Sequence, residues 1–164
     1  MNIKPNELKE NIFELIGDRW MLITAGKGNE INTMTASFGG FGVLFFKNVA
    51  HIYVRPERHT FGYLESNDTF SLCFFDDSYK KELTYCGRTS GRDEDKINKC
   101  GFTVLTDNDT PYFKQSKITV ICKKIYSQDI AKECFTDIEA YEKTYSSGGM
   151  HRMYIGEILN VITE

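Results

Sequence analysis

Three polar segments carry more cations, hydroxyl groups and glycines than hydrophobic packing requires. They are NTMTAS at residues 32–37, RPERHT at residues 55–60 and SGRDEDK at residues 90–96. Arginine matches phosphate oxygens with a planar fork, lysine supplies a point charge, and glycine lets a ligand approach the backbone closely. Because each segment lies beside the predicted end of a strand or helix, together they indicate a site for a phosphate-bearing cofactor.

The second of these segments has the composition of an anion site at the start of a helix. Pro56 ends the preceding strand because it cannot donate to the ladder. A helix that starts after it presents free N–H groups and the positive end of its dipole, and Arg55 and Arg58 add charge. The same residues also fit a solvated turn in which Arg58 pairs with a neighbouring glutamate.

The first segment places three hydroxyl groups on one face of an extended strand. Thr33, Thr35 and Ser37 alternate with Met34 and Ala36. Hydroxyl groups suit the polar edge of a heterocyclic ring, and small residues let that ring approach the backbone. The alternative is an edge strand whose hydroxyl groups face water.

The third segment combines tight turns with a helix start. Asp93 is the expected N-cap, which would place Lys96 within reach of a phosphate. The alternative is a capped surface helix whose internal ion pairs contribute little.

The elements that position these segments follow from hydrophobic periodicity. Short strands at close spacing, with few crossover helices, indicate an antiparallel barrel: a mainly β fold with flanking helices in one domain, residues 1–164. Residues 134–145 fit a helix or an irregular insertion. Helices are expected over residues 6–16, 57–65, 79–85 and 93–99, and strands over residues 20–25, 31–37, 43–46, 49–55, 69–75, 117–126 and 151–162.

Composition excludes several classes of function. The net charge is −3 without a basic stripe, so no nucleic-acid partner is expected. No apolar run reaches the roughly 18 residues of a membrane span, and the polar N-terminus lacks a signal-peptide core, so we expect a cytoplasmic protein. The five cysteines include no Cys-x-x-Cys pair, so we expect buried free thiols in a reducing compartment and no metal site.

The segments NTMTASFGG, VRPERHT, CGRTSGRDEDK and HRMYIGEI, in this order, resemble the flavin reductase-like, FMN-binding split-barrel family, which includes the flavoredoxins. The resemblance runs from residue 20 to the C-terminus, and residues 86–96 are its most specific part. It implies a split β-barrel that holds FMN at a homodimer interface. The cofactor-binding residues it implies are Thr33, Met34, Thr35, Ala36 and Ser37 near the ring, Arg55, Arg58, His59 and Thr60 near the phosphate and ribityl chain, and Ser90, Arg92 and Lys96 in a second polar loop.

The same resemblance implies an FMN-binding oxidoreductase that accepts hydride from NADH or NADPH. No Gly-x-Gly-x-x-Gly fingerprint is present, so a nicotinamide would bind without a Rossmann unit. One alternative is a flavoredoxin-type electron carrier that acts with protein partners, and another is a flavin-storing or sensing module. His151 matches a family histidine near the open face of the flavin, although it also fits a structural strand-end residue. Phe38 and His59 replace the tryptophan and tyrosine of many relatives. Cys86 is either redox-active or, more simply, inert and buried.

Overall fold

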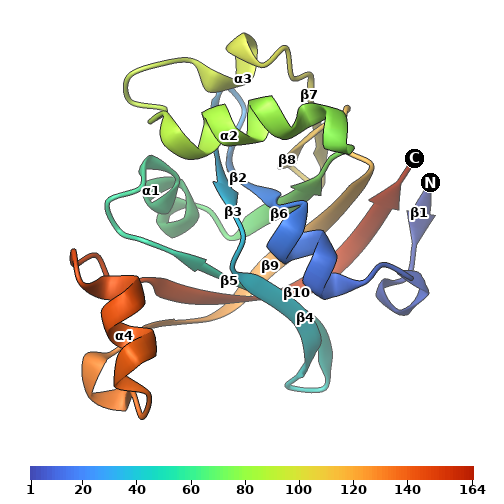
Figure 1. Cartoon of the computed structure of the whole chain (residues 1–164). Coiled ribbons are helices and arrows are strands. Elements are labelled where there is room, and N and C mark those ends of the chain that lie inside the picture. The colour runs from blue at the N-terminus through green and yellow to red at the C-terminus, as the bar shows by residue number, and fades with distance from the viewer.

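The computed structural model describes residues 1–164, and an eight-stranded antiparallel sheet forms its centre (Figure 1). The strand order is β3-β2-β6-β9-β10-β5-β4, with β1 paired to β10. The antiparallel, mainly β architecture expected from the sequence is therefore present. The strands are β1 (Asn2–Ile3), β2 (Met21–Lys27), β3 (Glu30–Ala36), β4 (Gly39–Leu44), β5 (Lys47–Val54), β6 (Thr69–Phe74), β9 (Ile118–Asp129) and β10 (Arg152–Thr163), and a separate hairpin pairs β7 (Val104–Asp107) with β8 (Thr110–Phe113).

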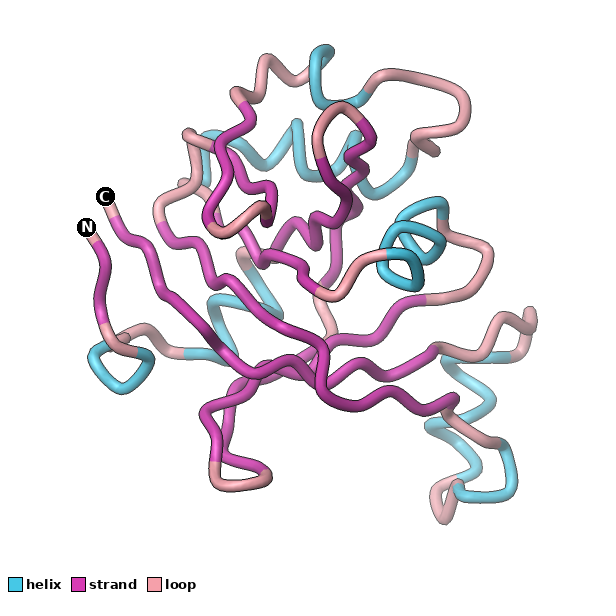
Figure 2. Tube along the Cα trace, turned by 180° about the vertical axis from the view of Figure 1, so that it is seen from behind, coloured by secondary structure: helices cyan, strands magenta, loops and turns pink.

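The longest strands, β9 and β10, coil the sheet around its core. Their register shifts between Ile155 and Gly156 and again between Ile158 and Asn160. These irregularities bend β10, so its first half pairs with β5 while its end pairs with β1 (Figure 2). The bends also break simple alternation: Ile155 is buried, whereas Leu159, expected on the same face, is 45% exposed.

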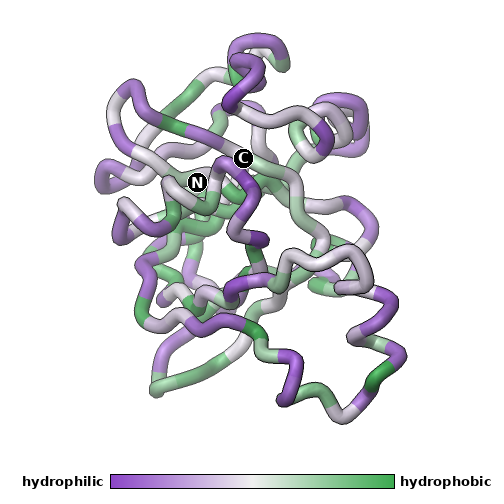
Figure 3. The backbone as a smooth tube through the Cα atoms, turned by 90° about the vertical axis from the view of Figure 1, so that its left-hand side faces the viewer, coloured by the Kyte–Doolittle hydropathy of each residue, from purple (hydrophilic) through white to green (hydrophobic).

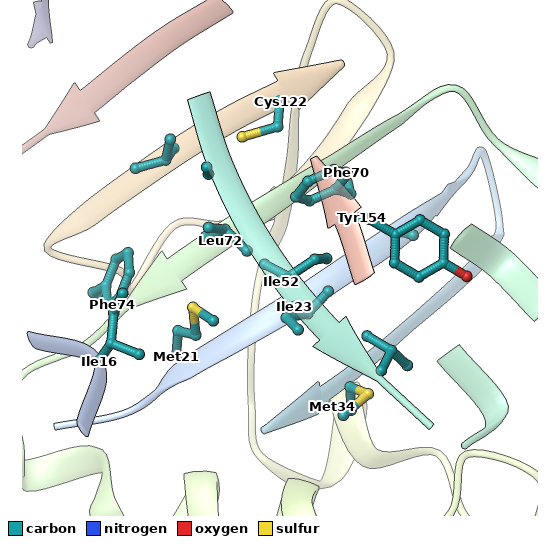
Figure 4. Close-up of a cluster of buried hydrophobic side chains, with 14 of the residues drawn as sticks. Ile16, Met21, Ile23, Met34, Ile52, Phe70, Leu72, Phe74, Cys122 and Tyr154 are labelled. Carbon is teal, nitrogen blue, oxygen red and sulfur yellow. The ribbon is translucent and has the colours of Figure 1, made fainter. Parts of the chain in front are cut away.

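Two hydrophobic clusters fill the molecule. The larger lies inside the curved sheet and joins residues from β2, β5, β6, β9 and β10 (Figure 4). At its edge the Tyr154 ring is buried while its hydroxyl group points away and donates to Glu65 Oε1 at 2.5 Å. The smaller cluster lies beneath the helix that follows β6 and stacks Phe75 on Phe102 with ring centroids 5.0 Å apart.

Four α-helices flank the sheet: α1 (His59–Ser66), α2 (Lys80–Arg88), α3 (Lys96–Lys99) and α4 (Ile138–Tyr145). Three predicted helices near the site are present, but their ends differ. The α2 helix continues through Gly87, and the N-cap of α3 is Asp95, whose carboxylate accepts from the Asn98 amide, rather than Asp93. The short α3 begins later because residues 90–95 form turns.

The predicted N-terminal helix over residues 6–16 is present only from residue 12, and the helical segment continues to Asp18. The chain forms a 3-10 turn at Pro5–Glu7 and a π-helix at Glu14–Asp18. Leu15 and Ile16 are buried while Leu8 and Ile12 pack only partly on the core. Leu8 therefore packs from the loop after the 3-10 turn, whereas Ile12, Leu15 and Ile16 pack from one helical segment. The β7–β8 hairpin and β1 were not anticipated, because they are short and lack clear alternation.

The β4–β5 hairpin projects from the sheet with an apolar tip that Figure 3 colours green. Phe45 and Phe46 form the turn with φ of 53° and 59°, and Phe46 is fully exposed. Val43 is also 75% exposed. Large apolar residues gathered at one exposed tip are typical of a protein–protein contact. None of the helices is both long and apolar enough to cross a membrane.

Gly156 is the position where β10 crosses the core most closely. A Cβ added there would lie 2.7 Å from Phe70 Cζ and 2.8 Å from Cys122 Cβ. We expect Gly156→Ala to lower the free energy of unfolding by about 1–3 kcal/mol, measured by urea denaturation. Gly62→Ala is the control, because Gly62 lies in α1 with nothing near its Cβ position, and should be neutral or stabilising by up to about 1 kcal/mol. Equal effects of the two substitutions would contradict this packing.

Candidate functional site

Two adjoining cavities bring the predicted segments together on one side of the sheet. A polar cavity of about 260 Å³ lies between β3, the start of α1 and residues 87–96. A smaller cavity of about 160 Å³ lies beside the end of β3 and includes Phe38, Tyr53 and His151. Both contain Met34 and Arg58, so they form one groove with a cationic end and a more apolar end.

The start of α1 supplies the polar cavity with cationic and N–H groups. Arg58 is the N-cap, and the amides of His59 and Thr60 in the first turn have no acceptor within the helix. The half-buried Arg58 guanidinium forms no hydrogen bond or ion pair within the chain. Burial lowers its pKa, although an arginine remains charged at neutral pH. An unpaired, half-buried cation beside a helix N-terminus favours an anionic ligand.

Lys96 joins three elements from inside the same cavity. Its side chain is buried, and its Nζ donates to Thr33 O at 2.6 Å and to Cys86 O at 3.0 Å. Burial lowers the pKa of Lys96 to about 8. Because an ammonium group carries three protons, one donor remains for a ligand. The residue therefore holds α2 and α3 against β3 and also lies in the cavity wall.

The loop between α2 and α3 closes the cavity from the opposite side. Ser90 Oγ accepts from the Arg92 amide at 3.2 Å, and Arg92 Nη1 donates to Glu57 O at 3.2 Å. A Cβ on Gly91 would lie 2.1 Å from Asn32 Oδ1, so only glycine allows the loop to approach β3 this closely. A larger depression of about 520 Å³ lies beyond the loop, but three adjacent carboxylates at residues 93–95 line it and disfavour a phosphate there.

The hydroxyl face of β3 is largely satisfied by the protein itself. Thr33 Oγ1 bonds Thr24 Oγ1 at 2.9 Å and donates to Ile23 O, while Thr35 Oγ1 donates to Leu83 O. These two hydroxyl groups therefore fasten β3 to its neighbours and do not require a ligand. Ser37 is exposed at the end of the strand, beside Ala36, where the more apolar cavity begins.

Arg55 occupies a different position from Arg58. Its guanidinium donates to Thr144 O at 2.9 Å and to Gly148 O at 3.0 Å, and it lies 5.6 Å from the Tyr145 ring centroid. These contacts attach the segment between β9 and β10 to the end of β5. Arg55 lines the smaller cavity but not the polar one.

His151 precedes β10 and is 9% exposed. Its Nδ1 bonds Tyr145 Oη at 2.8 Å, and its ring centroid lies 5.7 Å from that of Phe38. Burial, reinforced by Arg55, lowers the pKa of His151, so the ring is neutral at pH 7. The His151 side chain is thus held by a tyrosine hydroxyl group and lies in the wall of the smaller cavity.

The groove contains each predicted cofactor-binding residue except Thr33, which contributes through its carbonyl group. Sequence reasoning missed Asn32, which is buried and donates through Nδ2 to Thr60 Oγ1 at 2.8 Å. Tyr53 was also missed, although its alternation with buried Ile52 and Val54 placed it on the outer face of β5. Trp20 is half-buried, and the Lys80 ammonium group lies over its ring, 3.3 Å from the ring centroid.

The model of the flavin reductase like domain matches residues 15–164 of the chain. The chain belongs to this family. No curated protein sequence is significantly similar to it. The fold is the split β-barrel of the flavin reductase-like, FMN-binding proteins, as the resemblance implied.

Solved structures share this fold at low sequence identity. Flavoredoxin from Methanosarcina acetivorans is 19% identical with a TM-score of 0.72, over 100% of this chain and 76% of that one. An FMN-binding protein from Thermus thermophilus with bound 1-cyclohex-2-enone is 16% identical with a TM-score of 0.70, over 96% and 76%. The NADH:FAD oxidoreductase SgcE6 from Streptomyces globisporus C-1027, in complex with NAD and FAD fragments, is 16% identical with a TM-score of 0.63, over 88% and 74%.

The lowered pKa of Lys96 predicts a pH dependence of stability. Between pH 8 and the usual lysine value of 10.5, the unfolded chain holds a proton that the folded protein has released, so stability rises with pH. Relative to Lys96→Met, the wild-type free energy of unfolding should increase by up to about 3 kcal/mol across this window. Urea unfolding of both proteins at several pH values measures the difference, and parallel pH profiles would contradict a buried ammonium group.

Proposed function

We propose that the protein is an FMN-binding oxidoreductase whose polar cavity holds the cofactor phosphate. The unpaired guanidinium of Arg58 carries this proposal, because it lies half-buried beside the first turn of α1 and close to Lys96 and Arg92. A phosphate group would give these cations and the free N–H groups their missing partner. Family membership makes a flavin the natural bearer of that phosphate.

The groove offers suitable groups for the remaining parts of FMN in a consistent order. From the phosphate end, Thr60 and Ser90 offer hydroxyl groups to the ribityl chain, and Met34 leads into the smaller cavity. In this smaller cavity, which we call the ring-side cavity, the end of β3 with Ala36 and Ser37 would lie against the ring. The chain then excludes water from one ring face, while FMN supplies the capacity to accept a hydride and to release electrons singly.

Two roles remain to be distinguished for such a flavoprotein. We favour reduction by NADH or NADPH, because neutral His151 lies in the wall of the ring-side cavity and can orient a nicotinamide by hydrogen bonding. SgcE6, a protein of similar fold, is named an NADH:FAD oxidoreductase. The alternative is an electron carrier that receives electrons from protein partners, with flavoredoxin as the similar fold.

We further propose that residues 1–164 act as one cytoplasmic domain within a homodimer. The ring-side cavity, about 160 Å³, is smaller than the roughly 300–1,000 Å³ of typical ligand pockets, so a second copy would be needed to enclose a tricyclic ring. The apolar β4–β5 tip supplies a surface suited to that contact.

Arg58→Ala should weaken FMN binding by about 10–100-fold, because it removes a charge-assisted phosphate contact of about 1.5–3 kcal/mol. Riboflavin, which lacks the phosphate, should bind wild type and variant equally. Isothermal titration of the apoprotein measures both ligands. Lys123→Ala removes an exposed cation outside the groove and serves as the charge-matched control. An unchanged FMN affinity in Arg58→Ala would place the phosphate elsewhere.

Stopped-flow absorbance tests the choice between reductase and carrier. Wild-type protein loaded with FMN should lose its oxidised-flavin absorbance on mixing with NADH or NADPH, and His151→Ala should react more slowly while FMN stays bound. His51→Ala is the control, because the His51 ring lies outside the groove and touches it only through its bond to Tyr53. Bleaching by dithionite but by neither nicotinamide would instead support the electron carrier.

Phe46→Glu tests the dimer. A carboxylate at the fully exposed hairpin tip would be desolvated in an apolar contact, so light scattering should detect a monomer that binds FMN at least about 10-fold more weakly. Phe13→Glu, at a residue 89% exposed but outside the hairpin, should remain dimeric. A monomeric wild-type protein that retains FMN would refute the shared site.

A further inference from the structure

Two thiols face each other on either side, in sequence, of the segment that lines the polar cavity. Cys86 lies in the last turns of α2 and Cys100 directly follows α3, and their Sγ atoms are 3.7 Å apart. Both are free, with Cys86 fully buried and Cys100 half-buried. A disulfide bond requires about 2.05 Å, so a shift of less than about 2 Å would join the two sulfur atoms.

The position of this pair in the chain relates it to the cavity. Residues 87–96, between the two cysteines, supply the loop side of the polar cavity, including Ser90, Arg92 and Lys96. Lys96 Nζ also donates to the carbonyl oxygen of Cys86 itself. A disulfide bond between Cys86 and Cys100 would therefore cross-link the two sides of the segment that contains the proposed phosphate-binding loop.

We propose that Cys86 and Cys100 form a reversible disulfide bond that fixes the loop of residues 87–96 and strengthens FMN binding. The bond itself depends only on the two thiols, whereas its effect on FMN rests on the proposed function. The reduced and oxidised protein would then hold the same cofactor with different affinity.

The bond can form by exchange with a small disulfide such as glutathione disulfide. The Cys100 thiolate attacks one glutathione sulfur atom, breaking that S–S bond and releasing one glutathione thiolate. The Cys86 thiolate then attacks the Cys100 sulfur atom and releases the second glutathione. The two cysteines lose two electrons and two protons, and glutathione disulfide becomes two glutathione thiols. Cys100 reacts first because it is partly exposed.

The reaction should be slow and the product stable. Burial raises the pKa of both thiols, to about 12 for Cys86, so few thiolates exist at neutral pH. The two residues are fourteen positions apart, and closing a loop of this length restricts the unfolded chain. The same restriction reduces the conformational entropy that the loop loses when it closes on a phosphate, so binding becomes more favourable.

The experiment uses full-length Cys134→Ser, because Cys134 is exposed and would form mixed disulfides. The apoprotein is equilibrated with glutathione redox buffers and alkylated, and its peptides are mapped by mass spectrometry. Loss of two hydrogen atoms should map to Cys86 and Cys100. The oxidised form should unfold about 5–10 °C higher and bind FMN about 3–10-fold more tightly than the reduced form. Cys100→Ser in the same background should show none of these changes, and Cys86→Ser provides a second such variant.

Failure to map a bond between these two residues, even in excess glutathione disulfide, would overturn the proposal. Equal FMN affinity of the two redox forms would overturn the coupling to the cofactor. Absence of FMN binding by both redox forms would refute the proposed function instead. The mapped bond and the thermal shift would still decide whether the disulfide forms, because neither measurement involves a ligand.

Discussion

The pairing of β10 with both β5 and β9 is the constraint on which the architecture depends. Because β10 bends at its register shifts, it joins the two halves of the sheet and closes it around the core. Arg152 pairs with Val54, which brings the residues just before β10 beside those just after β5. His151 and Arg55 meet in the ring-side cavity for this reason, although almost a hundred residues separate them in the sequence. The polar cavity depends in turn on the buried Lys96, which connects β3 to both helices.

The cost of that buried charge explains several local features. An ammonium group out of water requires nearby acceptors, and the carbonyl oxygens of Thr33 and Cys86 supply two of them. Gly91 lets the loop come close to β3, where the buried Asn32 lies against it and donates to Thr60. The cavity is thus a polar network, in which the removal of one member leaves others unsatisfied.

Much of this arrangement is predictable from the sequence, because the relevant signals are local. Alternation places Ile52 and Val54 on the buried face of β5, and Pro56 followed by a polar segment indicates the start of α1. What the sequence does not reveal is which polar groups bind one another across the fold. The partners of Thr35 and Arg55 come from elements distant in the sequence, so the sequence does not show that this hydroxyl group and this guanidinium already have acceptors within the protein. The first half of the predicted N-terminal helix is absent for a similar reason, because periodicity records the spacing of apolar residues but not the surfaces on which they pack.

The segment between β9 and β10 is attached to the site by few contacts, and this has a consequence for local unfolding. Three bonds carry most of the attachment: two from Arg55 to carbonyl oxygens of residues 144 and 148, and one from Tyr145 to His151. Most side chains of α4 are exposed, so it belongs to the low-stability end of the molecule. When α4 opens, Arg55 loses its two carbonyl acceptors and His151 loses its tyrosine partner. The imidazole is then free, and Arg55 keeps only its ion pair with Glu57 at 3.9 Å. Amide exchange in α4 and the electrostatic potential of the cavity therefore both report the same equilibrium, the local opening of α4.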